Sequence, residues 1–344
     1  MRLFDDGELV MINLTNIKVS FGDFVALHDI NMTVEQGEFF TLLGPSGCGK
    51  TTTLRTITGF IKPDIGSVKV GDEEITHLEV EKRNIGMVFQ NYALFPTMSV
   101  YENIAFGLKV KKLAKAEIRR KVDEIAAKVE LDQEQLAKKI SQQSGRQQQR
   151  VAITRALVTS PPIICLDEPL SNLDAKLRVQ LRNELKDLQR KFGITTIYVT
   201  HDQEEALTLS DRIAVFNKGN IEQIGRPNEI YNYSATEFVC NFIGDINKLD
   251  KEFLERAGAG ARGVDTSKNC YIRLERIYVN NPQDNQIESD ALVEDFEYYG
   301  LYIKYTINSG GLQLKVIEKN SGSPMYQTGE KIKISFNPTC VMQF

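Results

Sequence analysis

The sequence has little cysteine, and its cysteines form no CxxC pair. There are five, an odd number, and they lie far apart in the chain: Cys48, Cys165, Cys240, Cys270 and Cys340. This spacing argues against a disulfide framework and favours a reducing compartment.

Long apolar runs and a secretory leader are also missing. No stretch approaches the roughly 18 consecutive apolar residues of a membrane span. Residues 1–11 carry Asp5, Asp6 and Glu8 and lack the basic-then-apolar layout of a signal peptide. We therefore expect a cytosolic chain that does not itself cross a bilayer.

Strong charge of either sign is absent. Lys and Arg total 42 and Asp and Glu total 46, which gives a net charge of -4, so nothing attracts the whole chain to nucleic acid. With 42% hydrophobic residues, the composition excludes a disordered or fibrous chain. A length of 344 residues predicts two domains.

The first 245 residues or so alternate between strand-like and helix-like segments, which is typical of an α/β domain with a largely parallel sheet. Short apolar runs predict strands at Glu38–Leu43, Pro162–Leu166 and Thr195–Val199. Apolar residues at helical spacing predict one helix from about residue 114 and another that Gly193 ends. Residues 91–160 are richer in helix and predict an inserted helical subdomain.

The pattern changes after about Asp245. Apolar residues alternate with polar ones in Leu301–Ile307 and again in Ile332–Phe336, which predicts a small β-domain. The Gly-rich and Ala-rich segment Ala257–Gly263 is typical of a flexible joint. We therefore expect an α/β domain at residues 1–244 and a β-domain at residues 245–344.

A phosphate-binding loop lies between the first predicted strand and the next helix. The pattern G-x-x-x-x-G-K-[ST] is matched by Gly44, Pro45, Ser46, Gly47, Cys48, Gly49, Lys50 and Thr51, and Thr52 follows. Glycines let backbone N–H groups turn toward phosphate oxygens, and the helix adds its positive end. Lys50 is predicted to reach the β- and γ-phosphates, and the Thr51 hydroxyl to bind Mg²⁺.

Two carboxylates end the apolar strand at residues 163–166. A buried strand has no structural need for Asp167 and Glu168 at its end, apart from capping, whereas a nucleotide with Mg²⁺ does. We expect Asp167 to hold the metal through water and Glu168 to orient and activate the attacking water.

Together the motifs resemble the ATP-binding subunit of ABC transporters, over almost the whole chain. Gln90 resembles the Q-loop glutamine, which contacts metal and water, and Ser171-Asn172-Leu173-Asp174 resembles the D-loop. His201 resembles the switch histidine that contacts the γ-phosphate. Phe21 lies where the family places an aromatic ring on adenine, although a core position remains the alternative.

The signature segment, residues 143–147, departs from the family pattern of leucine, serine, two glycines and glutamine. Its members are Gln143, Ser144, Gly145, Arg146 and Gln147. In the family this segment faces the ATP bound by the opposite subunit. An arginine there can obstruct the close approach of this segment to that ATP, or it can add a positive charge beside the phosphate. We hypothesise that it slows ATP turnover.

The resemblance implies a translocase: a membrane-associated ATPase on the cytoplasmic face of the membrane, with ATP and Mg²⁺ as cofactors. A single phosphate loop implies a head-to-tail homodimer. The apolar residues Asn91–Pro96 resemble a docking surface for permease subunits, which take solute from an extracytoplasmic binding protein. The C-terminal domain resembles a small β-barrel-like (OB-type) regulatory domain.

Two segments bear on the transported solute. Phe242–Asn247 resembles the start of the regulatory domain in polyamine and ferric-iron importers, and Glu38–Leu43 favours ferric iron. A polyamine or another solute, as in the maltose group, is the alternative. Two other classes stay open: a soluble ABC ATPase acting on DNA or the ribosome, and a weakly hydrolysing regulatory module. Seven basic residues in Lys109–Lys121 predict a solvated helix face, with membrane or partner contact as the alternative.

Overall fold

The computed structural model describes residues 3–4, 8–171, 173–281, 286–322 and 324–344. The chain forms two compact units, Met1–Asn228 and Glu229–Phe344. The division falls inside the short helix α8 (Pro227–Asn232), and each unit is described by itself.

The first unit is built on a six-stranded sheet with the strand order β11-β10-β4-β9-β8-β7. All neighbours are parallel except β10 and β11. Its strands are β4 (Phe39–Leu43), β7 (Ile85–Val88), β8 (Ile163–Asp167), β9 (Thr195–Thr200), β10 (Arg212–Asn217) and β11 (Asn220–Gly225). The three strands predicted from apolar runs are β4, β8 and β9, and the α/β class is confirmed.

A second, antiparallel sheet covers one face of the first. Its strands are β1 (Leu3–Phe4), β2 (Glu8–Phe21), β3 (Phe24–Glu35), β5 (Ile65–Val70) and β6 (Glu73–Glu74). Because side chains alternate along a strand, successive residues of β4 pack on opposite sides. Phe40 and Leu42 pack against apolar residues of β2 and β3, whereas Phe39 belongs to the core under the helices.

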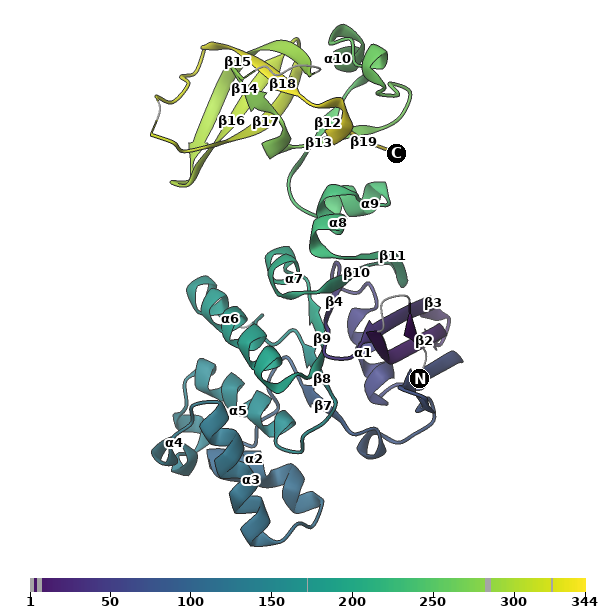
Figure 1. Cartoon of the computed structure of the whole chain (residues 1–344), viewed down its shortest axis with the longest axis vertical. Helices are drawn as coiled ribbons and strands as arrows, with labels where there is room; N and C mark the ends of the chain where they lie inside the picture. Colours follow the sequence, from purple (N-terminus) through teal and green to yellow (C-terminus); the bar gives the residue numbers. More distant parts are fainter. Residues whose placement is uncertain (1–2, 5–7, 172, 282–285, 323) are drawn as a thin grey trace. The chain divides into compact units, whose positions relative to one another are not determined.

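Helices α2 to α7 cover the other face (Figure 1). They are α2 (Val100–Val110), α3 (Lys115–Lys128), α4 (Gln133–Ala137), α5 (Gly145–Leu157), α6 (Ala175–Phe192) and α7 (Gln203–Leu209). Helix α1 (Lys50–Thr58) instead packs its Leu54 and Ile57 into the core that the antiparallel sheet covers. Left-handed glycines end two helices of this unit, Gly59 after α1 and Gly193 after α6, as the sequence predicts. Helices α2 to α5 lie together as a group (Figure 1).

The second unit is mostly antiparallel sheet. One sheet has the order β14-β18-β15-β16-β17 and curls, and a smaller one has the order β12-β13-β19, so the predicted barrel-like domain class is confirmed. The strands are β12 (Ile246–Leu249), β13 (Cys270–Arg273), β14 (Tyr278–Val279), β15 (Ile287–Tyr298), β16 (Tyr302–Ser309), β17 (Leu312–Lys319), β18 (Lys331–Phe336) and β19 (Met342–Gln343). Two short helices accompany them, α9 (Glu237–Phe242) and α10 (Lys251–Arg256).

The segment predicted as a joint lies inside this unit. Ala257–Gly263 follows α10, and Ala259 is fully buried in the core of the second unit. The residues at 258 and 260–263 are exposed, so the segment is a surface loop of this unit that Ala259 anchors to the core, which composition alone does not distinguish from a linker. In the part of the chain that the structure describes, no helix is long and apolar enough to cross a membrane.

Candidate functional site

The phosphate loop connects β4 to α1. Its Gly47 and Gly49 have φ angles of 78° and 108°, in the left-handed region that favours glycine. A Cβ added to Gly49 would also lie 2.6 Å from the Leu27 side chain. The loop conformation therefore depends on glycine at these positions, and it exposes the tip of the loop at Ser46 and Gly47.

Lys50 is folded across the loop. It is only 4% exposed, and its ammonium group donates hydrogen bonds to the carbonyl oxygens of Gly44 and Pro45, at 2.8 Å each. The neighbouring Cys48 is buried, and burial raises the pKa of its thiol. Cys48 is thus a packing residue of the loop, whereas the lysine places a positive charge inside it. Thr52 follows in the first turn of α1, partly buried.

Thr51 and Asp167 meet although they are far apart in sequence. The Thr51 hydroxyl donates to Asp167 Oδ1 at 3.0 Å, where α1 begins and β8 ends. Asp167 is 6% exposed, and burial raises its pKa, an effect that the Thr51 hydrogen bond partly offsets. Hydroxyl and carboxylate oxygens are the ligands that Mg²⁺ prefers, and Mg²⁺ usually takes one or two protein ligands and completes its shell with water and phosphate oxygens. The donor set present therefore fits Mg²⁺ that arrives with a nucleotide.

Glu168, His201 and Gln90 converge beside this pair. Glu168 Oε2 lies 3.2 Å from His201 Nδ1 and 3.5 Å from Gln90 Nε2. Each residue follows the carboxyl end of a different parallel strand, β8, β9 and β7. Parallel strands end at one edge of the sheet, which is where α/β folds bind their ligands. The arrangement gathers a carboxylate, an imidazole and an amide around one point.

Glu168 is held by its backbone as well. Its φ is 45°, an uncommon conformation for a residue with a side chain, and its amide donates to the Val199 carbonyl at 3.1 Å. Gln90 also donates to the Ser171 hydroxyl, at 3.2 Å. Ser171 therefore belongs to this cluster, a role that its place in the D-loop did not predict.

The D-loop leads into α6. Asp174 caps the start of α6, where its carboxylate accepts from the Leu177 amide at 3.0 Å, and Asn172 lies outside the described residues.

Phe21 ends β2 and is 53% exposed, so a core position, the alternative interpretation of this residue, is wrong. An exposed ring of this kind is available to stack on a planar ligand.

The signature segment leads into α5. Ser144 caps the helix in a reciprocal capping box with Gln147, in which the Ser144 amide donates to Gln147 Oε1 at 2.9 Å. Gly145 is the first helical residue. Arg146 turns away toward α6, where its guanidinium pairs with Glu184. Nothing in the sequence pattern indicated this partner.

The segment predicted to dock a permease is only partly exposed. Tyr92 is 7% exposed, and its hydroxyl donates to the Pro169 carbonyl at 3.2 Å. Arg155 donates to the carbonyls of Ala93 and Tyr92, at 2.8 and 2.9 Å. Tyr92 therefore belongs to the core, and any docking surface here is formed by its neighbours.

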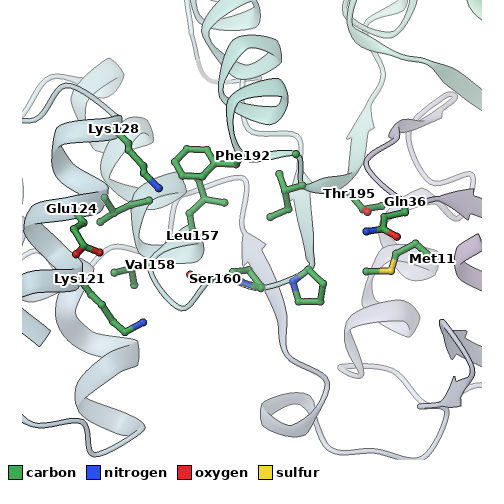
Figure 2. Close-up of a pocket in the computed structure, with 15 residues that line it drawn as sticks. Met11, Gln36, Lys121, Glu124, Lys128, Leu157, Val158, Ser160, Phe192 and Thr195 are labelled. Atoms are coloured by element: carbon green, nitrogen blue, oxygen red, sulfur yellow. The ribbon is translucent and has the colours of Figure 1, made fainter. Parts of the chain in front are cut away.

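A pocket of about 350 Å³ lies elsewhere, where α3 faces the starts of β8 and β9 (Figure 2). Lys121 and Lys128 from α3 and Phe192 from α6 are among its lining residues, and none of the predicted site residues is. Parallel strands begin at the edge opposite their ends, so this pocket is separate from the phosphate loop.

Comparison with known proteins gives consistent results. Residues 27–171 match the family model described as ABC transporter. The chain is 43% identical to the spermidine/putrescine import ATP-binding protein PotA of Acetivibrio thermocellus, over 96% of this chain and 95% of that protein. It is 51% identical to PotA of Haemophilus influenzae, over 95% and 94%. It is also 39% identical to the Fe(3+) ions import ATP-binding protein FbpC of Fusobacterium nucleatum, over 94% and 90%.

Solved structures agree in fold. The cbiO1 protein of Clostridium perfringens, part of the ABC transporter complex cbiONQ, superposes with a TM-score of 0.61 and 30% identity, covering 66% of this chain and 93% of that one. A dimeric ATP-binding cassette in a post-hydrolysis state, bound to ADP and Pi, gives 0.56 and 34%, covering 63% and 99%.

Proposed function

The chain belongs to the ABC transporter family, as the ATP-binding and ATP-hydrolysing subunit of an importer, and on this premise we propose that two copies of it, joined to membrane-spanning subunits, drive the uptake of a polyamine. The convergence of Glu168, His201 and Gln90 beside Asp167 carries the catalytic part of the proposal.

The phosphate loop binds the ATP phosphates. Lys50 gives up its contacts with the Gly44 and Pro45 carbonyls and pairs with the β- and γ-phosphates, since a phosphate oxygen is a stronger partner for an ammonium group than a carbonyl. Thr51 and Asp167, with Gln90, would hold Mg²⁺, which would supply charge neutralisation on the phosphates. Phe21 stacks on the adenine ring.

Hydrolysis depends on the carboxylate of Glu168. It lies where it can accept a proton from a water in line with the γ-phosphate, and Gln90 orients the same water. His201, on the neighbouring strand end, donates to the γ-phosphate. The strained backbone of Glu168 keeps its carboxylate at this point of the sheet edge.

Each complete site requires two copies of the chain. A copy has one phosphate loop and one signature segment, and Ser144 and Gly145 present the N-terminus of α5, which attracts an anion. In a head-to-tail dimer, this end of α5 contacts the ATP held by the partner, and Asp174 of the D-loop lies at the contact. The dimeric cassette with ADP and Pi bound supports this arrangement.

A substitution at Glu168 tests the catalytic proposal. We expect Glu168→Gln to bind ATP, to hydrolyse it at least about 100-fold more slowly, and to accumulate as a dimer. Phosphate release and size-exclusion chromatography with ATP measure both. The matched control is Glu204→Gln, which neutralises an exposed carboxylate that pairs with Arg182. This variant should keep the activity of the wild type. Near-normal turnover in Glu168→Gln would refute the assignment.

The solute is proposed as a polyamine such as spermidine or putrescine, because relatives named for that import reach 52% identity, against 39% for the relative named for Fe(3+) import. The ferric iron favoured by residues 38–43 is thus not supported. Residues 1–244 act as the nucleotide domain and residues 245–344 as the regulatory domain, on the cytoplasmic face of the membrane.

An uptake assay tests the solute. The complete complex, with its membrane-spanning subunits and its solute-binding protein in vesicles, should take up labelled spermidine when ATP is inside, and Glu168→Gln should abolish uptake. Ferric-ion uptake without spermidine uptake would refute the polyamine. Stimulation of the ATPase by nucleic acid or ribosomes, instead of by the membrane complex, would refute import.

A further inference from the structure

Arg146 occupies an electrostatically unfavourable place. It is the second residue of α5, and the first turn of that helix contains no acidic residue. The N-terminus of a helix carries partial positive charge, so a cation in the first turn is repelled by it. Some other group must therefore stabilise the guanidinium.

That group comes from α6. Glu184 Oε1 pairs with Arg146, and Glu184 Oε2 accepts from Arg150 at 2.8 Å. With its amide oxygen facing the guanidinium, Gln180 accepts from Arg146 Nη1 at 3.1 Å and from Nη2 at 3.0 Å. Arg146 and Arg150 are four residues apart on α5, and Gln180 and Glu184 are four apart on α6, so two helix faces meet in register.

These contacts hold the Arg146 side chain against α6 and away from the exposed N-terminus of α5. Ser144 is exposed there and Gly145 has no side chain, so the first amides of the helix stay accessible. A guanidinium released from α6 would lie over this end. Of the two arginines, Arg146 is the more exposed, with 35% of its side chain accessible against 21% for Arg150.

We propose that Glu184 is a positioning residue that holds Arg146 against α6 and so keeps the signature segment open to the ATP of a second copy. The inference rests on the proposed head-to-tail dimer. It explains how the chain accommodates arginine where close approach favours glycine: the side chain is retained by an acidic group of the same copy.

Removing the charge of Glu184 should release Arg146. In Glu184→Gln the two guanidinium groups lose their shared counter-charge and repel each other, and the more exposed one moves outward. We expect kcat/KM for ATP to fall about fivefold, the fold-change that corresponds to losing one partly exposed ion pair. The control is Asp187→Asn, which makes the same charge change at an exposed residue of the same helix. Its kcat/KM should match that of the wild type.

A double substitution separates positioning from folding. If Glu184 acts through Arg146, adding Glu184→Gln to Arg146→Gly should leave kcat/KM unchanged from Arg146→Gly alone. If Glu184 acts through Arg150 or through the stability of α5, the loss should persist in that background. A persistent loss, or no loss in Glu184→Gln itself, overturns the proposal.

A dimer assay distinguishes this inference from the function on which it rests. Glu168→Gln with ATP should dimerise, and Glu168→Gln combined with Glu184→Gln should need about fivefold more ATP to do so. Equal dimerisation of the two variants overturns the role of Glu184 while the head-to-tail dimer stands. Failure of Glu168→Gln to dimerise at any ATP concentration overturns both.

Discussion

Replacing Glu38 with glutamine should stabilise the protein at neutral and alkaline pH. Glu38 precedes β4 and is only 6% exposed. Its Oε2 accepts from the Glu35 amide at 2.7 Å, while Oε1 lacks a hydrogen-bond partner among the described residues and lies 3.6 Å from Arg212. Burial raises the pKa of this carboxyl from 4.5 to about 7, and the Arg212 charge offsets only part of the effect.

The raised pKa determines the sign and the size of the effect. The native state binds the proton more tightly than the unfolded state, so the unfolding free energy falls as pH rises from about 4.5 to about 7. At about 1.36 kcal/mol for each pKa unit, the loss reaches about 3 kcal/mol above pH 7. Glutamine keeps the shape and never ionises. Glu38→Gln should therefore exceed the wild type by up to about 3 kcal/mol at pH 8, with the difference shrinking to near zero at pH 4.5.

Urea denaturation followed by circular dichroism measures this, because the chain has no tryptophan to report by fluorescence. Asp187→Asn, which neutralises an exposed carboxyl that is not among the charges acting on Glu38, is the control and should show no gain that grows with pH. A Glu38→Gln protein that is no more stable than the wild type at pH 8, or whose advantage grows as pH falls, would refute the reasoning.

Arg146→Gly should raise the ATPase rate by less than about tenfold. This gain is smaller than the effect of a whole lost transition-state contact, about 2.7–4 kcal/mol, because the guanidinium is already held on α6. An unchanged or lower rate contradicts the hypothesis of slowed turnover. Gln149→Met should raise the unfolding free energy by about 1–2 kcal/mol, because this fully buried amide has no hydrogen-bond partner among the described residues; destabilisation would show that the amide is needed. Phe21→Ala should weaken ATP binding by about tenfold, measured with a fluorescent nucleotide, while Phe21→Tyr retains it. Asp167→Asn should raise the Mg²⁺ concentration for half-maximal ATPase without preventing folding, and an unaltered Mg²⁺ titration would remove Asp167 from the metal site.

Local features of the chain were predictable because they depend on neighbouring residues. Gly47 and Gly49 mark a loop that needs left-handed backbone, and Gly59 and Gly193 mark helix ends for the same reason. The alternation along β16 likewise predicted that Ile303, Tyr305 and Ile307 would be buried, and they are. Leu301, which continues the pattern by one step, lies before the strand and is 84% exposed.

The sequence by itself determined the phosphate loop, the strand that ends in Asp167 and Glu168, and the family, because each depends on short patterns whose backbone conformation is set by adjacent residues. The tertiary structure decided which strand ends share an edge, and thus that Glu168 lies 3.2 Å from His201 and 3.5 Å from Gln90. It also decided that Arg146 pairs with Glu184 and that Tyr92 is buried. These contacts join residues far apart in sequence, so they depend on how the sheet and the helices pack and leave no local pattern to detect.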